Sequence, residues 1–182
     1  CRSSERCTDF AENKKTGRIR ILIEGDSSAP HKNVDESFKI VEKLDPLKFE
    51  IWYMAYHGAP KEWYRVDKFL PEVPYERVQE IYHQCDILLK SSILESFSYP
   101  PLEMMAGGGL VVAVQNDGNR EYLKDKENCL IYPKGDIEAG KNAVLRICQD
   151  EKLCSRLREN GKKTAEQRDW NNLIEEIINL YM

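Results

Sequence analysis

The sequence lacks long apolar runs and any excess of positive charge. No segment reaches the roughly 18 consecutive apolar residues that a membrane-spanning helix needs, and no signal-peptide pattern opens the chain. The 182 residues carry 27 basic and 31 acidic side chains, which gives a net charge of −4. Proteins that bind nucleic acid usually present a basic stripe, so this balance argues against nucleic acid as a partner.

Motifs for metal binding and for cysteine clusters are also absent. The chain contains no D-x-D sequence, and His57 and His83 are separated from each other and from acidic clusters, so no metal site is predicted. The six cysteines include no C-x-x-C pair, and Cys85, Cys129 and Cys148 fall on apolar faces of predicted elements. Reduced core thiols in a cytoplasmic protein are the simplest interpretation.

Short apolar runs alternate with helix-period patterns along the chain. The predicted strands cover residues 19–24, 49–56, 68–73, the run that follows Asp86, 110–114 and 129–132. The predicted helices cover residues 32–44 and 75–85, a segment after Ser98, a short turn of helix near Asn119, and everything from Ile137 onward. This order predicts an α/β fold with a doubly wound, Rossmann-like parallel sheet and extra C-terminal helices. We interpret residues 18–182 as one domain and residues 1–17 as a linker or the tail of a preceding segment.

The most informative segment reads E-S-F-S-Y-P-P-L-E, from Glu95 to Glu103. Pro100 and Pro101 fit the first turn of a helix, and Ser98 can serve as its N-cap. Glu95 then lies in a loop at the carboxyl end of a strand, where α/β sheets hold ligands, and Glu103 lies about one turn into the helix. The helix start favours an anion, above all a phosphate, whereas the two carboxylates favour hydroxyl groups, which sugars supply.

This segment resembles the E-x7-E signature of retaining glycosyltransferases with the GT-B fold, the glycosyltransferase group 1 family (family 4). The resemblance continues upstream through P-Y-E-R-V-Q-E-I-Y-H-Q-C-D at 74–86 and downstream through E-M-M-A-G-G-G-L-V-V-A at 103–113. It also includes the glycine loop at 118–121 and N-C-L-I-Y-P at 128–133. The likeness extends over roughly residues 18 to 180 and keeps the family's order and spacing.

The resemblance implies the C-terminal, donor-binding half of a two-domain enzyme. Residues 18–182 would bind a nucleoside-diphosphate sugar without a metal or a cofactor. The glycosyl group would pass, with retention, to a hydroxyl of a glycan or another acceptor, as in polysaccharide biosynthesis. The N-terminal acceptor-binding domain would be missing from this chain, which alone would then be inactive. Peripheral association of the full-length protein with a membrane is compatible with this setting.

The same resemblance assigns roles to individual residues. Glu95 would contact the transferred sugar and Lys32 would hold the diphosphate, as the two catalytic residues, while Glu103 would accept hydrogen bonds from the ribose. The further donor-binding candidates lie in loops at the carboxyl ends of strands: Gly25, Val73, Ser96, Phe97, Ser98 and Gly118. Ser96 and Ser98 stand where the family usually has glycines, and Phe97 is interpreted mainly as a packing residue.

Asp26 departs from the family pattern, which has an arginine beside the first glycine. A carboxylate there would repel the diphosphate, so either Lys90 or Arg120 compensates or donor binding is weakened or lost. A catalytically inactive relic that binds nucleotides or acts as a scaffold therefore remains an alternative. An unrelated dehydrogenase-like or response-regulator-like module is a further alternative, although G-x-G-x-x-G and the acidic cluster of those proteins are missing after the first predicted strand.

Overall fold

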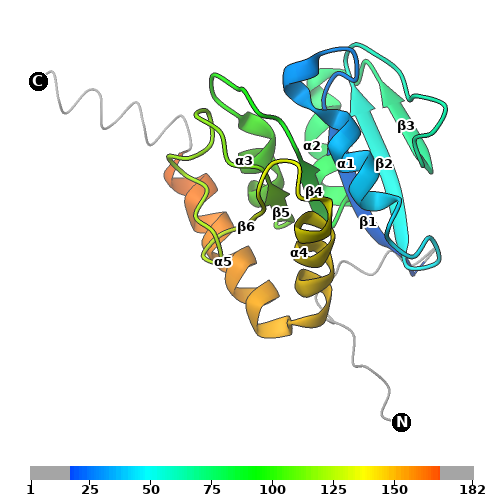
Figure 1. Ribbon diagram of the computed structural model, residues 1–182. Coiled ribbons are helices and arrows are strands. Elements are labelled where there is room, and N and C mark those ends of the chain that lie inside the picture. Colours follow the sequence, from blue (N-terminus) through cyan, green and yellow to red (C-terminus); the bar gives the residue numbers. More distant parts are fainter. Residues whose placement is uncertain (1–16, 169–182) are drawn as a thin grey trace, which may run out of the picture.

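One six-stranded parallel sheet organises residues 17–168, the part of the chain that this computed structural model describes (Figure 1). The strands, in chain order, are β1 (Ile19–Glu24), β2 (Phe49–Ala55), β3 (Lys68–Pro71), β4 (Ile87–Lys90), β5 (Leu110–Ala113) and β6 (Leu130–Ile131). Their order across the sheet is β3-β2-β1-β4-β5-β6, and every neighbouring pair is parallel. The doubly wound, Rossmann-like α/β sheet predicted from the sequence is confirmed.

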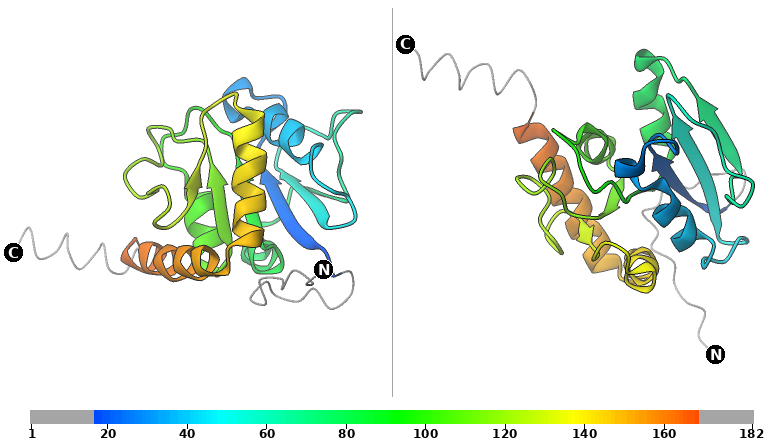
Figure 2. Two further views of the ribbon diagram at one scale, coloured as in Figure 1. Left: turned by 60° about the horizontal axis from the view of Figure 1, so that its bottom comes forward. Right: turned by 45° about the horizontal axis from the view of Figure 1, so that its top comes forward.

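Helices cover both faces of the sheet (Figure 2). They are the 3-10 helix η1 (Pro30–Lys32) and the α-helices α1 (Val34–Val41), α2 (Tyr75–Gln84), α3 (Tyr99–Ala106), α4 (Ile137–Gln149) and α5 (Glu151–Gln167). Side chains of α1 and α4 pack in the core on one face, and side chains of α2 and α3 pack in the core on the other. The fifth helix, α5, packs against α3 and α4. The part of the predicted C-terminal helical segment that follows residue 168 lies outside the described residues.

The near-continuous apolar runs in the sequence arise because the inner strands are buried on both faces. In β1, Ile21 and Ile23 pack toward α1 and α4, whereas Leu22 packs toward α2 and α3. Leu88 of β4 packs on the same face as Leu22, toward α2 and α3. All four side chains are at most 1% exposed, and each fully buried aliphatic side chain contributes about 1.5–3 kcal/mol to folding.

The sheet reverses its winding between β1 and β4, which are hydrogen-bonded neighbours. The chain leaves β1 toward α1 on one face and leaves β4 toward α3 on the other face, so the loops after these strands separate and leave a crevice at the carboxyl edge. Because Ile23 pairs with Leu89, Glu24 and Lys90 end the two strands side by side. The topology thus brings two charged residues to the point where ligands usually bind in such folds.

Two predicted helices differ from the structure. Residues 32–44 do not form one helix, since Asn33 adopts a left-handed conformation (φ 49°) that separates η1 from α1, a conformation that asparagine tolerates. The predicted turn of helix near Asn119 is instead a run of hydrogen-bonded turns. There the side chains of Asn116 and Asn119 accept from the backbone N–H groups of Gly118 and Asn116, and such bonds compete with a regular helix.

Predicted core positions mostly agree with the structure. The apolar side of the first helix is buried, as are Cys85 and Cys129, both of which are free thiols. Core burial, the default expectation for a tryptophan, holds for Trp52 but is wrong for Trp63. The Trp63 side chain packs edge-on against Tyr64 and stays 43% exposed. Within residues 17–168 no helix is both long enough and apolar enough to cross a membrane.

Candidate functional site

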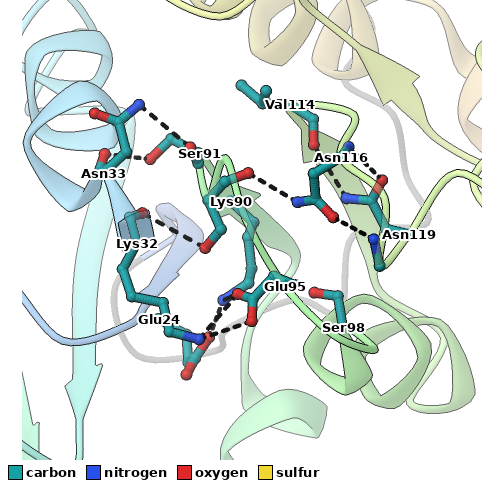
Figure 3. A network of polar contacts seen from close by, with 12 residues as sticks. Glu24, Lys32, Asn33, Lys90, Ser91, Glu95, Ser98, Val114, Asn116 and Asn119 are labelled. Carbon is teal, nitrogen blue, oxygen red and sulfur yellow. Dashed lines mark hydrogen bonds and ion pairs between the residues drawn. The ribbon is translucent and has the colours of Figure 1, made fainter. Parts of the chain in front are cut away.

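Four charged side chains form a connected network at the carboxyl edge, between β1 and β4 (Figure 3). Lys32 Nζ donates to both carboxylate oxygens of Glu95, at 3.0 and 2.8 Å. Lys90 Nζ lies 2.5 Å from Glu24 Oε2 and 3.3 Å from Glu95 Oε1. Two lysines therefore converge on Glu95, and Glu24 extends the network across the switch point between the strands.

Two loops that are far apart in the sequence hold Lys32 and Glu95 together. The Ile93 N–H donates to the His31 carbonyl at 2.9 Å, and Ser91 Oγ donates to the Asn33 carbonyl at 2.6 Å. The Asn33 amide in turn donates to the Ser91 carbonyl at 3.3 Å. These bonds join η1 to the loop after β4, so Lys32 and Glu95 face each other on a fixed framework.

The electrostatic surroundings keep Glu95 and Lys90 charged. Burial by itself would raise the pKa of Glu95, but the charges of Lys90 and Lys32 and the hydrogen bond from Lys32 outweigh it and hold that pKa below its usual value. Burial would likewise lower the pKa of Lys90, yet Glu24 and Glu95 outweigh that effect and the pKa is raised. Both groups are therefore ionised at neutral pH.

A cavity of about 560 Å³ adjoins this network between β2, α2 and α3. Glu24 and Glu103 line it together with Val73, and the exposed rings of Tyr56, Tyr75 and Tyr99 also belong to its lining. Burial raises the pKa of Glu103, a hydrogen bond with Tyr82 opposes the rise, and the nearby charge of Glu24 adds to it. Glu24 thus connects the charged network to the cavity that holds Glu103.

The start of α3 lies beside Glu95, but it offers fewer donors than its position suggests. Ser98 occupies the N-cap position, and its backbone N–H already donates to the Gly118 carbonyl at 3.2 Å. The first four N–H positions of the helix, which have no partner within it, are those of residues 98–101. Pro100 and Pro101 have no N–H, so the Tyr99 N–H is the one that remains. Ser98 Oγ makes no capping bond and is buried without a hydrogen-bond partner.

Two of the predicted donor-binding glycines support the framework of the site. Gly25 has a positive φ of 141°, and its N–H donates to the Met54 carbonyl at 3.1 Å. A Cβ at Gly25 would lie 3.4 Å from Lys32 Cβ, and a Cβ at Gly118 would lie 2.6 Å from the Glu95 carbonyl oxygen. Both glycines let a neighbouring segment approach closely, as glycine's missing side chain allows.

The other predicted residues divide between the crevice and its surroundings. Ser96 is exposed in the loop before α3. Phe97 packs against the rings of Tyr99 and Tyr122, with centroids 4.8 and 5.7 Å apart, in agreement with a packing role. Arg120, one of the two candidate compensating cations, is exposed and pairs with Asp117 at 3.1 Å. It does not join the network around Glu95.

Asp26, which stands where the resembling family has an arginine, turns toward its own loop. Its Oδ1 accepts hydrogen bonds from the Ser28 N–H at 2.8 Å and from Ser28 Oγ at 2.7 Å, and the side-chain bond is the largest cause of its lowered pKa. Its carboxylate also lies against Gly58 of the loop after β2. Asp26 therefore stabilises a turn and makes none of the contacts that define the network.

Sequence reasoning missed Glu24. Its signal was a charged residue that follows the apolar run I-L-I at the end of a strand, and Lys90 follows the apolar run I-L-L in the same way. Lys90 was a candidate cation from the sequence, but its pairing with Glu24 follows only from the strand order, which places the two side by side. Within residues 17–168 no group of three or more His, Cys, Asp and Glu side chains is arranged to hold a metal ion.

Comparison with known proteins places this chain in a family. The model of the family described as "Glycosyl transferases group 1" matches residues 67–164, more than half of the 182 residues. The O-antigen biosynthesis protein RfbC of Myxococcus xanthus is 32% identical over 109 residues, which cover 58% of this chain and 8% of RfbC. The chain spans less than a third of the length of such relatives, from 8% of RfbC to 30% of an uncharacterized glycosyltransferase of Methanocaldococcus jannaschii.

Solved structures agree in fold. The C-terminal domain of the glycosyl transferase group 1 family protein LpcC from Francisella tularensis aligns with a TM-score of 0.71 at 19% identity, covering 91% of this chain and 93% of that domain. Anabaena HepE in complex with UDP-glucose aligns with a TM-score of 0.76 at 15% identity, covering 96% of this chain and 52% of HepE. The chain belongs to the glycosyl transferases group 1 family and has the fold of the C-terminal domain of its GT-B members.

Proposed function

We propose that residues 18–182 form the donor-binding domain of a glycosyltransferase that moves a sugar from a nucleoside diphosphate to an acceptor hydroxyl with retention. Lys32 holds the diphosphate, Glu95 orients the sugar, and Glu103 accepts hydrogen bonds from the ribose in the cavity. The acceptor is bound by a further domain outside this chain, so transfer requires the longer protein. Neither a metal nor a cofactor takes part.

The observation that carries this proposal is the continuity of the charged residues along one crevice. Lys32 and Glu95 are in direct contact, and Glu24 pairs with Lys90 while lining the same cavity as Glu103. A diphosphate beside Lys32 and the α3 start leaves a nucleoside on the side of the cavity. The transfer then depends on stabilising charge on the departing diphosphate, which a lysine and a helix N-terminus supply.

Calorimetric titration with a panel of nucleoside diphosphates tests this proposal. We expect micromolar binding of at least one nucleotide and a roughly 10- to 100-fold loss of affinity in Lys32→Ala and in Glu103→Ala, since each removes a charge-assisted hydrogen bond. Lys152→Ala and Glu127→Ala, at exposed positions outside the crevice, are matched controls that should bind as the unmodified chain does.

The absence of binding by every nucleotide would instead favour the alternative of a relic that has lost its donor site. Two observations make that alternative concrete. Asp26 replaces a cation, and Lys32 already uses its charge on Glu95. The titration therefore separates a working donor site from a scaffold with the same fold.

A further inference from the structure

Lys32 has two competing partners if the proposed function holds. Without a ligand its ammonium group donates to both oxygens of Glu95, so the two residues assigned to the donor are engaged with each other. An ammonium group has three N–H donors, and two of them point at one carboxylate. A diphosphate that takes the charge of Lys32 must therefore weaken this pair, and Glu95 then loses a cation.

Glu95 cannot lose its compensating charge without consequence. Its side chain is only 12% exposed, and a carboxylate in such a place either takes up a proton or turns toward water when it is left unpaired. Either change would alter the hydrogen bonds that Glu95 offers to a sugar hydroxyl. A second cation that does not move is needed to keep the carboxylate in place.

Lys90 meets this need. Its ammonium lies 3.3 Å from Glu95 Oε1, and its side chain is 1% exposed, so it has no free surface for a ligand. Glu24, at 2.5 Å, holds it from the other side. We propose that Lys90 is a positioning residue that keeps Glu95 charged and in place when Lys32 turns to the diphosphate, with Glu24 as the counter-ion of Lys90. This inference rests on the proposed function.

The strand register explains why Lys90 can serve this role. Ile23 pairs with Leu89, so Glu24 and Lys90 follow on the same face of adjacent parallel strands. The groups that face Glu95 are Lys90 from the end of β4, Lys32 from η1, and Ser92 and Tyr122 from the surrounding loops. Of these, Lys90 is anchored by a strand backbone and a second carboxylate. The positioning role proposed for Lys90 takes the place of the hypothesis from the sequence, in which Lys90 compensates for the missing arginine at the diphosphate.

A ligand-free experiment tests the first half of the proposal. The titration of the Glu95 carboxyl carbon is followed by NMR in the unmodified chain, in Lys32→Met, in Lys90→Met and in the double variant. We expect a small rise of the Glu95 pKa in Lys32→Met, because Lys90 still holds the carboxylate, and a much larger rise in the double variant. A rise in Lys32→Met as large as that in the double variant would show that Lys90 does not hold Glu95.

A binding experiment tests the second half. The affinities of the best nucleoside diphosphate and of its glucose, galactose and N-acetylglucosamine conjugates are compared between the unmodified chain and Lys90→Met. We expect the diphosphate affinity to fall, because a diphosphate that takes the charge of Lys32 then leaves Glu95 without a cation. The affinity for the best sugar conjugate relative to the diphosphate should fall about tenfold in addition, as for one lost charge-assisted hydrogen bond. The loss should shrink as the pH rises, because Glu95 then regains its charge.

The outcomes separate failure of this inference from failure of the proposed function. If no nucleotide binds the unmodified chain, the proposed function fails and the role of Lys90 toward a donor fails with it. If binding is normal and Lys90→Met leaves the ratio unchanged, or lowers both affinities equally, only the role of Lys90 is overturned. Lys90→Met leaves the Glu24 carboxylate unpaired and could for that reason fail to fold. The double variant Glu24→Gln/Lys90→Met removes both charges and should fold in either case. It should show the same tenfold fall in the ratio.

Discussion

Gly118 lies directly against the backbone of Glu95. A Cβ at residue 118 would come within 2.6 Å of the Glu95 carbonyl oxygen and 2.8 Å of its Cβ, distances that side chains do not tolerate. The Gly118 carbonyl also accepts from the Ser98 N–H at 3.2 Å. The loop after β5 therefore fixes the segment from Glu95 to Ser98 from behind, and its glycine sets how near the two loops lie.

Gly118→Ala should displace Glu95 and weaken the domain. Because the obstructing atoms belong to the backbone, we expect the free energy of unfolding to fall by about 1–3 kcal/mol, as in other overpacked sites. Urea unfolding measures this change. Gly107→Ala is the control, since a Cβ there would meet nothing closer than 3.5 Å. Equal stability of the two variants would contradict the close approach of residue 118 to Glu95.

Ser98→Ala should leave stability unchanged and weaken nucleotide binding. The hydroxyl of Ser98 is buried without a partner and does not cap α3, so its removal costs the free protein little. A phosphate bound beside the Tyr99 N–H would give that hydroxyl its missing partner, and its loss should lower the affinity about 3- to 10-fold. A fall of about 1 kcal/mol in stability, typical of a lost N-cap, would contradict this account.

Glu103→Gln should stabilise the free domain at neutral pH. The pKa of Glu103 is raised above its ordinary value of 4.5, mainly by burial, so the ionised form costs folding free energy. Protonated Glu103 favours the folded state at low pH, and this contribution to stability is lost as the pH rises through the raised pKa. We expect the variant to gain stability over the unmodified chain above pH 4.5 and to lose this advantage below it.

Unfolding free energies measured from pH 4 to pH 8 for both proteins check this prediction, and Glu127→Gln is the exposed control. An advantage that does not depend on pH would mean that charge burial is not its cause. A buried carboxylate that lowers the stability of the free protein is typical of binding sites.

Cys85 and Cys129 should resist alkylation while the domain is folded. Burial raises the pKa of each thiol to about 12, so little reactive thiolate exists at pH 8. Iodoacetamide treatment followed by peptide mass spectrometry should find both residues unmodified in buffer and modified in urea. Rapid modification in buffer would contradict the burial of Cys85 at the end of α2, or of Cys129 directly before β6.

The fold was predictable because burial on two faces leaves a strong pattern in the sequence. The run Ile87 to Leu89 reads as a buried strand, and the spacing of Val34, Phe38 and Val41 reads as one helix face. Local exceptions were not predictable in this way. Asn33 interrupts a helix through its left-handed backbone, and Trp63 remains partly exposed in the long loop before β3.

The candidate site was predictable in part. The spacing from Glu95 to Glu103 indicated a strand, a loop and a helix, and the structure has this order. The pairing of Glu24 with Lys90 depends on the register between strands 66 residues apart in sequence, which no local pattern contains. Likewise, the Ser98 N–H is engaged by a carbonyl from another loop, so the number of free donors at the start of α3 follows only from tertiary structure.

An NMR titration of the backbone amides with the nucleoside diphosphate that binds best tests the central claim most directly. The account predicts the largest shifts at Tyr99 and along residues 25–32 and 95–98, with small shifts around the separate pocket at Lys124 and Tyr132. Saturable shifts confined to that pocket, or spread evenly over the domain, would contradict the placement of the diphosphate between Lys32 and the start of α3.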